Sequence, residues 1–454
     1  MIKVSKFGGS SLADASQIKK VCEIILSDPD RKLVIVSAPG KRNRQDIKVT
    51  DLLIALADSY IAGYDPQYDY DKVMERYSSI AHELGLGDEI IATIERDLTE
   101  RCLMDTSFTG EFKDSLKASG EDNCAKLIAE YMKSMGHNAC YVNPGEAGLV
   151  LSAEYGNAHV LPESYENLAG LHDPYVIKII PGYFGFSKNG DVVTLPRGGS
   201  DVSGSIIAAA VNADIYENFT DVDSIFAVNP NLVENPAPIK DLTYKEMREL
   251  SYAGFSVFHE EALTPVYYRD IPVNIKNTNN PSSPGTTIHA NIDFENRNPV
   301  TGIAGSGGFS SIYIRRYLMN REIGFGRKVL QILEKEGIPY EHSPSGIDDI
   351  SIVIRTHYIP PEKENRVFKR LKKELDVDDI TIVHGQALVM IVGENCLGNP
   401  KTLHRAARAL ETSDIPVKMI NQGSSKVSIM FGMDEKYHVE AIRAFYREFF
   451  PEYN

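Results

Sequence analysis

Residues 2–11 read Ile2-Lys3-Val4-Ser5-Lys6-Phe7-Gly8-Gly9-Ser10-Ser11, an apolar-rich run that ends in two glycines and two serines. The run predicts a β-strand over 2–7, and apolar residues spaced three or four apart between Ile18 and Leu26 predict a helix behind it. Another apolar run over 32–37 predicts the next strand. Strands that alternate with helices indicate an α/β domain with a largely parallel sheet covered on both faces.

The same alternation continues toward the middle of the chain. Apolar runs predict further strands at 139–143, 176–181, 192–194, 214–219, 226–229 and 273–277. The small apolar residues of 203–211 predict a helix that packs closely against the sheet. A stretch rich in Asn, Pro, Ser and Gly over 278–300 is typical of a connector, so we expect a domain boundary there.

Beyond residue 300 the sequence contains an internal repeat. The pair Ile338-Pro339 recurs as Ile415-Pro416, and Ser351-Ile352 recurs as Ser428-Ile429, in both cases 77 residues later. Each copy predicts the order strand, helix, strand, strand, helix, with helices near 324–336 and 362–375, then 401–411 and 435–449. An extra strand is predicted before each copy, at 302–306 and at 380–384. This order fits two ferredoxin-like βαββαβ units.

Length and composition limit the class of protein. The chain has 454 residues, which corresponds to about three domains, and 43% hydrophobic residues are ordinary for a globular protein. A net charge of −15 disfavours general binding to nucleic acid or to an anionic membrane. The 5 widely spaced cysteines, the absence of an apolar signal segment and the absence of a run of about 20 apolar residues predict a cytoplasmic protein.

Four motifs could carry chemistry. Lys6 with the glycines after it suits an anion, because glycines allow close backbone approach and lysine supplies a mobile positive charge. Residues 195–201 (LPRGGSD) offer Arg197 for a carboxylate and Asp201 to hold a lysine or a metal. Glu121 begins a helical segment and could receive an ammonium group, and residues 219–231 suit a nucleotide pocket.

Taken alone, each motif also has an ordinary structural explanation. The first fits a tight turn with a solvated lysine, and the second fits an N-capping Ser or Asp. The third fits a carboxylate that complements a helix dipole, and the fourth fits an ordinary loop. The sequence contains no GxxxxGK[ST], no HExxH and no GxSxG, so a P-loop enzyme, a zinc hydrolase of that type and a serine hydrolase of the α/β type are disfavoured. No metal site is predicted from protein side chains.

The ordered set of motifs resembles the aspartate kinase family of the amino-acid kinase superfamily. The resemblance rests on KFGGSS at 6–11, SGE at 119–121, LPRGGSD at 195–201, FTDVDSIFAVNP at 219–230 and VNIKNT at 273–278, followed by a tail that is similar to paired ACT domains. It implies a three-layer, carbamate-kinase-like catalytic domain over 1–290, and two ferredoxin-like ACT domains over 301–378 and 379–454 whose strands could interleave.

The resemblance also implies the reaction and its residues. The expected reaction is transfer of the γ-phosphoryl group of ATP, with Mg²⁺, to the β-carboxylate of L-aspartate, which opens lysine, threonine and methionine biosynthesis. Lys6 and Asp201 are the expected catalytic residues. The expected aspartate-binding residues are Thr50, Glu121, Tyr183, Arg197 and Ser200. The expected nucleotide-binding residues are Lys6, Gly8, Gly9, Ser10, Thr220, Asp221, Phe226 and Asn231.

The tail is expected to bind an amino-acid effector, lysine with or without threonine, at an ACT–ACT interface. The residues implied are Met319, Glu322, Phe325, Gly326, Tyr340 and Glu341. Because ACT sheets usually pair between chains, the resemblance implies a homodimer or a higher homo-oligomer.

The sequence departs from the family pattern at three places. Ser256 stands where the family commonly has a phosphate-contacting lysine, and Asn231 stands where an arginine is common. Lys245 or Lys276 could compensate for the missing charge. The loop over 41–48 (KRNRQDIK) is longer and more basic than usual, and we predict that it helps to hold the ATP phosphates.

These departures leave two alternatives open. The chain could be an amino-acid sensor with an impaired kinase domain, or a kinase that acts on another carboxylate. The retained Lys6 and Asp201 argue against the first, and the Arg197 and Glu121 pair argues against the second. A fused kinase–homoserine dehydrogenase is not expected, because no stretch of the sequence is left over for a dehydrogenase.

Overall fold

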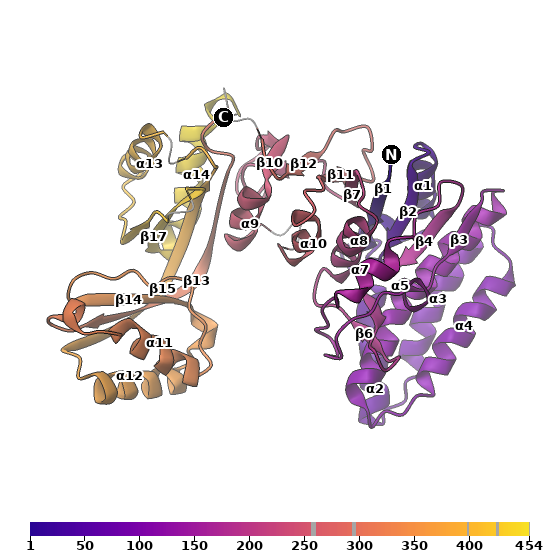
Figure 1. Cartoon of the computed structure of the whole chain (residues 1–454), viewed down its shortest axis with the longest axis horizontal. Helices are drawn as coiled ribbons and strands as arrows, with labels where there is room; N and C mark the ends of the chain where they lie inside the picture. The colour runs from indigo at the N-terminus through magenta and orange to yellow at the C-terminus, as the bar shows by residue number, and fades with distance from the viewer. Residues whose placement is uncertain (256–259, 293–296, 397–398, 424–425, 454) are drawn as a thin grey trace. The chain divides into compact units, whose positions relative to one another are not determined.

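The structure is a computed structural model that describes residues 1–255, 260–292, 297–396, 399–423 and 426–453 (Figure 1). The chain divides into two compact units. The first unit comprises 1–225, 238–247 and 256–293, and the second comprises 226–237, 248–255 and 294–454. The residue Ser256, where a family lysine is missing, lies outside the described residues.

An eight-stranded sheet with the order β10-β12-β11-β7-β1-β2-β4-β3 forms the centre of the first unit. All of its pairings are parallel except that between β11 and β12, as the alternating pattern predicted. The strands are β1 Lys3–Phe7, β2 Arg31–Val36, β3 Ala139–Tyr141, β4 Ile177–Pro181, β7 Ile215–Thr220, β10 Asp241–Thr243, β11 Val273–Asn277 and β12 Thr286–His289. The shorter strands are β5 Phe184–Phe186, β6 Val192–Thr194, β8 Ile225–Phe226 and β9 Pro238–Ile239. The strand predicted over 226–229 is therefore shorter and begins one residue earlier.

Helices cover both faces of this sheet. They are α1 Ala15–Leu26, α2 Val49–Ala62, α3 Gln67–Glu83, α4 Asp88–Cys102, α5 Thr109–Ser134, α6 Pro144–Ala147, α7 Glu163–Leu168, α8 Gly199–Ala210, α9 Tyr244–Tyr252 and α10 Thr264–Tyr267. Phe7, Val34 and Val36 share one hydrophobic core with residues of α1 to α5, which Figure 1 shows gathered beside the N-terminal strands. Because successive side chains of a strand alternate between faces, Val4 and Lys6 point to the opposite face.

The helix α8 packs on that opposite face. It is made of small residues, and a Cβ at Gly204 would lie 2.5 Å from the hydroxyl of Tyr216 in β7. The close helix–sheet packing predicted for 203–211 is therefore confirmed, although the helix begins earlier, at Gly199. The unit is a three-layer α/β/α domain, as expected.

The second unit contains an antiparallel sheet with the order β14-β13-β15-β17-β16. Its elements are β13 Gly302–Arg315, α11 Phe325–Lys335, β14 Asp349–Arg355, α12 Pro361–Leu375, β15 Asp379–Val392, α13 Lys401–Thr412, β16 Met419–Asn421, β17 Ser428–Asp434 and α14 His438–Phe449. The repeat is visible in these bounds, because β15 begins and ends 77 residues after β13. The two copies thus share one sheet, with the long strands β13 and β15 at its centre.

Two features of the repeat prediction are wrong. Between α11 and α12 the structure has one strand, β14, with isolated bridges at His342 and Ser345, where two strands were predicted. The extra strand at 302–306 is not separate from the strand that follows, since both belong to β13, and the strand at 380–384 is likewise part of β15. The pairing of β13 with β15 shifts register between Ser306 and Phe309, where Gly308 has a φ of 79°. A bulge of this kind bends a strand without ending it, so the glycines mark a bend and not a turn.

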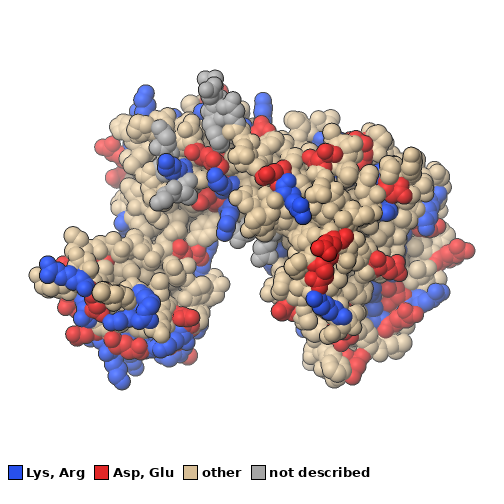
Figure 2. All heavy atoms as spheres, in the orientation of Figure 1, with Lys and Arg blue, Asp and Glu red and all other residues tan. Residues whose placement is uncertain are grey.

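Two further features are the distribution of charge on the surface and the length of the apolar helices. On the face shown in Figure 2, acidic and basic side chains are interspersed. No helix in the described part of the chain is long and apolar enough to cross a membrane.

Candidate active site

Lys6 lies on the α8 face of the sheet and is only 7% exposed. Its ammonium forms an ion pair with the carboxylate of Asp201 in the first turn of α8. Asn218 of the neighbouring strand β7 donates a hydrogen bond from Nδ2 to the same Asp201 Oδ1 at 2.8 Å. A buried charge is stable only when it is paired and hydrogen-bonded, and this trio meets that condition.

The glycine turn after β1 lies beside this ammonium group. A Cβ at Gly8 would lie 3.6 Å from Lys6 Nζ, and the Gly8 N–H donates to the carbonyl of Phe219 at 3.1 Å. The Gly9 carbonyl accepts from the Gly40 N–H at 2.8 Å, and a Cβ at Gly9 would come within 2.9 Å of the Ala38 carbonyl oxygen. Glycine is therefore required at Gly9, where a side chain would collide with the Ala38 carbonyl, whereas a Cβ at Gly8 would make only ordinary contacts.

A second glycine turn leads into α8. Gly198 has a φ of 77° and precedes the helix, which begins at Gly199. A Cβ at Gly199 would lie 2.6 Å from the ring of Tyr183, and one at Gly182 would lie 2.8 Å from the Ser200 Cβ. The turn thus brings Tyr183 and Ser200 together at the start of the helix that carries Asp201.

Arg197 and Glu121, two of the expected site residues, lack a full set of partners among the residues that the structure describes. The Arg197 side chain is exposed, and no ion pair or hydrogen bond joins it to another of the described residues. Glu121 of α5 is only 5% exposed, and its Oε2 has no hydrogen-bond partner in the part of the chain that the structure describes. Burial raises the pKa of Glu121 to about 8, while a hydrogen bond from the Ala38 backbone and the charge of Lys6 act in the opposite direction.

The chain is similar to known proteins over its whole length. The model of the amino acid kinase family matches residues 1–277, and that of the ACT domain matches residues 389–449. Aspartokinase 3 of Bacillus subtilis (strain 168) is 54% identical over 449 residues, covering 99% of both chains. The chain belongs to the aspartokinases of the amino acid kinase family.

Solved structures agree with this membership. Aspartate kinase of Clostridium acetobutylicum is 38% identical, with a TM-score of 0.87 over 99% of this chain and 100% of that one. E. coli aspartokinase III, described in complex with aspartate and ADP, is 22% identical, with a TM-score of 0.79 over 99% of this chain and 100% of that one. The latter likeness concerns the fold alone.

The structure brings together only some of the residues expected of an aspartokinase site. Lys6, Gly8, Asp201, Tyr183 and Ser200 are joined by the contacts given above. The prediction that Glu121 begins a helical segment is wrong, because Glu121 lies in the interior of α5, which starts at Thr109. Other expected residues of the first unit lie at the ends of its elements. Ser10 is exposed in the turn after β1, Thr50 is half-buried in the first turn of α2, Thr220 ends β7, and Asp221 is exposed directly after it.

Phe226 and Asn231 belong to the second unit, where Phe226 is half-buried and Asn231 is exposed. Lys276, considered as a replacement for the missing lysine, pairs with Phe219 in the sheet and therefore points to the face opposite Lys6. Burial lowers the pKa of Lys276, and the charge of Glu217 on the same face counteracts this effect.

The sequence analysis missed Asn218, which completes the Lys6–Asp201 pair. A signal was present, since Glu217-Asn218 places two polar residues in a strand between Tyr216 and Phe219, which are aromatic. Glu217 accepts hydrogen bonds from Arg31 at 2.7 and 2.9 Å on one face, while Asn218 faces Asp201 on the other. Buried polar residues in a central strand are worth attention because they require partners.

The basic loop over 41–48 is held by its own ion pair. Arg42 contacts the carboxylate of Asp46 through two nitrogens, at 2.9 and 3.0 Å, and the Arg42 hydrogen bond is the first cause that lowers the Asp46 pKa. Lys41 and Arg44 are exposed. The role predicted for this loop in phosphate binding stays a prediction, and Lys41 and Arg44 are its more accessible cations.

In the second unit, four of the expected effector residues lie between the end of β13 and the first turn of α11. These are Met319, Glu322, Phe325 and Gly326. The side chains of Met319 and Phe325 are buried.

Both expected effector carboxylates already have cationic partners. Glu322 forms ion pairs with Arg316 at 3.2 Å and with Lys328 at 2.7 Å, and Glu341 forms one with Arg355 at 3.3 Å. A ligand ammonium that binds either carboxylate would therefore have to share it with a protein cation.

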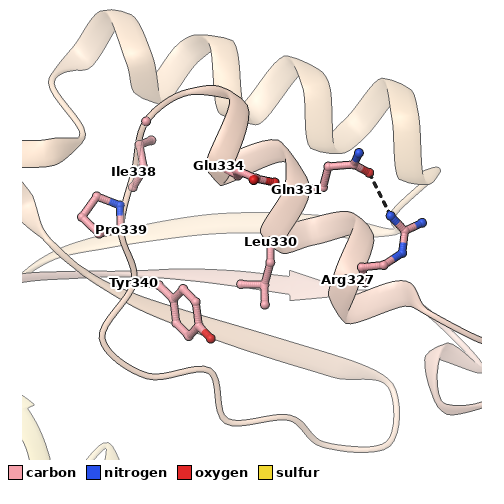
Figure 3. Close-up of a pocket in the computed structure, with 8 residues that line it drawn as sticks. Arg327, Leu330, Gln331, Glu334, Ile338, Pro339 and Tyr340 are labelled. Carbon is pink, nitrogen blue, oxygen red and sulfur yellow. Dashed lines mark hydrogen bonds between the residues drawn. The ribbon is translucent and has the colours of Figure 1, made fainter. Parts of the chain in front are cut away.

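An open cavity of about 850 Å³ lies beside α11 in the second unit (Figure 3). Arg327, Leu330 and Gln331 line it from the helix, and Pro339 and Tyr340 line it from the segment that follows. Of the six expected effector residues, Tyr340 lines this cavity.

Proposed function

We propose that this chain transfers the γ-phosphoryl group of ATP to the β-carboxylate of L-aspartate, giving 4-phospho-L-aspartate and ADP. The observation that carries the proposal is the buried Lys6–Asp201 pair beside the Gly8-Gly9 turn. Two unsatisfied charges of opposite sign, Arg197 and Glu121, lie in segments joined to this pair by short contacts. The high identity to the B. subtilis aspartokinase supports the same reaction.

On the phosphate side, the chain has to stabilise charge rather than supply a nucleophile. A β-carboxylate oxygen of aspartate forms the new bond to the γ-phosphorus, and the bond from that phosphorus to the β,γ-bridging oxygen breaks. Negative charge spreads over the transferring oxygens in the transition state. We assign Lys6 to these oxygens, Asp201 and Asn218 to holding the lysine in place, and the Gly8 and Gly9 backbone to close approach of the phosphates.

On the aspartate side, the two unsatisfied groups match the charges of an amino acid. The guanidinium of Arg197 would bind the α-carboxylate as a two-pronged hydrogen-bond donor, with Ser200 beside it. The Glu121 carboxylate would receive the ammonium group, and Thr50 and Tyr183 would complete the pocket. Holding both α-substituents leaves the β-carboxylate as the free acceptor, which is the orientation that the reaction needs.

For the nucleotide we assign Ser10, Thr220, Asp221, Phe226 and Asn231. The described residues contain no group of three or more His, Cys, Asp or Glu side chains that could hold a metal ion. Mg²⁺ would therefore be bound chiefly by the phosphate oxygens of ATP, where it neutralises charge.

One assay tests the activity directly. The purified protein with ATP, Mg²⁺ and hydroxylamine is expected to form aspartyl hydroxamate from L-aspartate and no product from L-glutamate. Hydroxamate from glutamate alone would favour the kinase for another carboxylate. No product from any acid, with ATP and effector binding retained, would favour the amino-acid sensor.

We further propose that the second unit regulates this activity. E. coli aspartokinase III is described in complex with lysine, which supports lysine as the effector here, with threonine as a possible partner in concerted inhibition. Inhibition of hydroxamate formation by lysine, by threonine or only by both distinguishes these cases. The same proposal includes a homodimer through the ACT domains, a cytoplasmic location and a role in lysine, threonine and methionine biosynthesis. Sedimentation of the protein tests the dimer.

A further inference from the structure

Two consecutive residues of α3, Arg76 and Tyr77, are buried side chains to which neither the sequence motifs nor the proposed chemistry assigns a role. Arg76 is 4% exposed, and arginine is almost never so buried unless it is paired. Its guanidinium donates to the Gly40 carbonyl at 2.8 Å, to the Ile47 carbonyl at 3.1 Å and to both oxygens of Asp46 at 2.7 and 2.8 Å. One side chain thus ties together both ends of the loop over 40–47.

That loop packs directly on the glycine turn of the site. The Gly40 N–H donates to the Gly9 carbonyl at 2.8 Å, and a Cβ at Gly40 would lie 2.5 Å from the Gly9 carbonyl carbon. The backbones are in such close contact that the position of Gly9 depends on the position of Gly40. Arg76 holds Gly40 through its carbonyl, on the other side of the same residue.

Tyr77 makes the equivalent contact to the aspartate side. Its hydroxyl donates to the Gly120 carbonyl at 2.6 Å, and Gly120 directly precedes Glu121. A Cβ at Gly120 would lie 2.9 Å from the Ala38 side chain, so this helix segment also packs on the start of the loop. Adjacent residues of α3 therefore hold the two halves of the site.

We propose that Arg76 is a positioning residue for phosphoryl transfer, which holds Gly40 against Gly9 and so fixes the glycine turn that approaches the ATP phosphates. The inference rests on the proposed function for the identity of that ligand. Arg76 touches no substrate in this assignment. It acts through its two terminal nitrogens, which a planar guanidinium holds in fixed geometry so that one reaches Gly40 and the other reaches Asp46 and Ile47.

Four variants test the proposal in the full chain. Arg76→Met removes the hydrogen bonds to Gly40 and Asp46. Arg76→Lys keeps the positive charge but loses the planar guanidinium, and Asp46→Asn weakens the interaction of Arg76 with the loop. Lys72→Met, one turn earlier on α3, is the matched control because it removes an exposed ion pair with Glu75. Misplacement of reacting groups by about 1 Å can reduce a rate about 100-fold, so we expect Arg76→Met to lower kcat by about 10- to 100-fold.

Two further readouts separate positioning from a loss of fold. The KM for ATP should rise in Arg76→Met and, less, in Asp46→Asn, while the KM for aspartate changes less than threefold. Tyr77→Phe should instead raise the KM for aspartate and change the KM for ATP less than threefold. Arg76→Lys should recover part of the activity of Arg76→Met. Wild-type kcat and ATP KM in Arg76→Lys and Asp46→Asn would overturn the proposal even if Arg76→Met fails to fold.

Calorimetric ATP binding by the same proteins does not depend on the acceptor. Weaker ATP binding in Arg76→Met and Asp46→Asn than in Lys72→Met would support the proposal, even if the wild-type protein forms no product. In that case the proposed function fails and the positioning role stands. Equal ATP affinity in all of these proteins would overturn the positioning role, whatever the activity of the wild type.

Discussion

The phosphate side and the aspartate side of the candidate site differ in how their charged groups are paired. On the phosphate side, Lys6 is buried and bound to Asp201, and Arg76 is buried and bound to Asp46. On the aspartate side, Arg197 is exposed without an ion pair to another described residue, and Glu121 is buried with one oxygen unsatisfied. The first arrangement is complete within the chain, whereas the second is completed by a ligand that carries one charge of each sign.

This difference follows from what each side has to do. Charge that develops only in the transition state is stabilised best by groups that are already held in place, because nothing then has to reorganise during the reaction. Groups that bind a charged substrate gain most when they have no internal partner to give up. The following substitutions test whether the two sides behave in these two ways.

The largest effect is expected at Lys6. Lys6→Met removes the cation assigned to the transferring phosphoryl group, and loss of one such group costs about 100- to 1,000-fold in kcat. The KM for aspartate should change little, because the aspartate-side charges remain. Steady-state kinetics measure both values, with Lys3→Met on the same strand as a control, since Lys3 pairs with Asp28 away from the site. A kcat within tenfold of wild type would remove Lys6 from the mechanism.

At Arg197 the expected effect is on binding. Arg197→Ala should raise the KM for aspartate about 30- to 100-fold, because a charge-assisted hydrogen bond contributes about 2–3 kcal/mol. The melting temperature should stay within about 2 °C of wild type, since exposed side chains contribute little to stability. Arg197→Lys, which keeps the charge but not the fork, should be intermediate. An unchanged KM for aspartate in Arg197→Ala would show that another group binds the α-carboxylate.

The raised pKa of Glu121 predicts a pH effect of opposite sign on binding and on stability. With a pKa of about 8 in the free protein, the carboxyl is mostly protonated at pH 7, so kcat/KM for aspartate should rise as the pH increases toward 8. Glu121→Gln should lose this limb of the profile together with most of the affinity for aspartate. A profile of Glu121→Gln that keeps the same limb would assign it to another group.

The effect on stability follows because a pKa that differs between the folded and unfolded states makes the free energy of unfolding depend on pH. Burial raises the pKa of Glu121 in the folded protein above the usual value of 4.5. The stability that the protonated form supports is therefore fully present below pH 4.5 and is lost as the pH rises to about 8. Glutamine carries no charge at any pH. Glu121→Gln should therefore be more stable than wild type at pH 8 by a few kcal/mol, at about 1.4 kcal/mol per pKa unit. Denaturant unfolding at pH 5 and at pH 8 measures the difference.

The sequence was sufficient for the motifs but not for the contacts between them. Lys6, Arg197 and Asp201 stand out because they lie next to glycine turns, and Glu121 stands out because its SGE motif takes its place in the same order of motifs, although it lies inside α5. The repeat beyond residue 300 was also visible, since identical short strings recur at one offset. These are local patterns, and each can be found without knowledge of the tertiary structure.

What the sequence could not provide depends on distant segments meeting. Asn218 matters because β7 lies next to β1, although 212 residues separate it from Lys6. Arg76 matters because α3 lies against a loop about 30 residues earlier in the chain. The continuity of β13 through two glycines depends on its pairing with β15, which a local pattern cannot reveal.

The smallest effect is expected at the exposed cations of the basic loop. Lys41 and Arg44 could add long-range attraction for ATP, whereas Arg42 is already paired with Asp46. Lys41→Gln with Arg44→Gln should raise the KM for ATP about two- to threefold at low salt and less at 0.5 M salt, because exposed charges are screened. The kcat should not change, which distinguishes attraction from positioning by Arg76. An ATP KM that equals the wild-type value at every salt concentration would show that the loop contributes through its backbone contact with Gly9 alone.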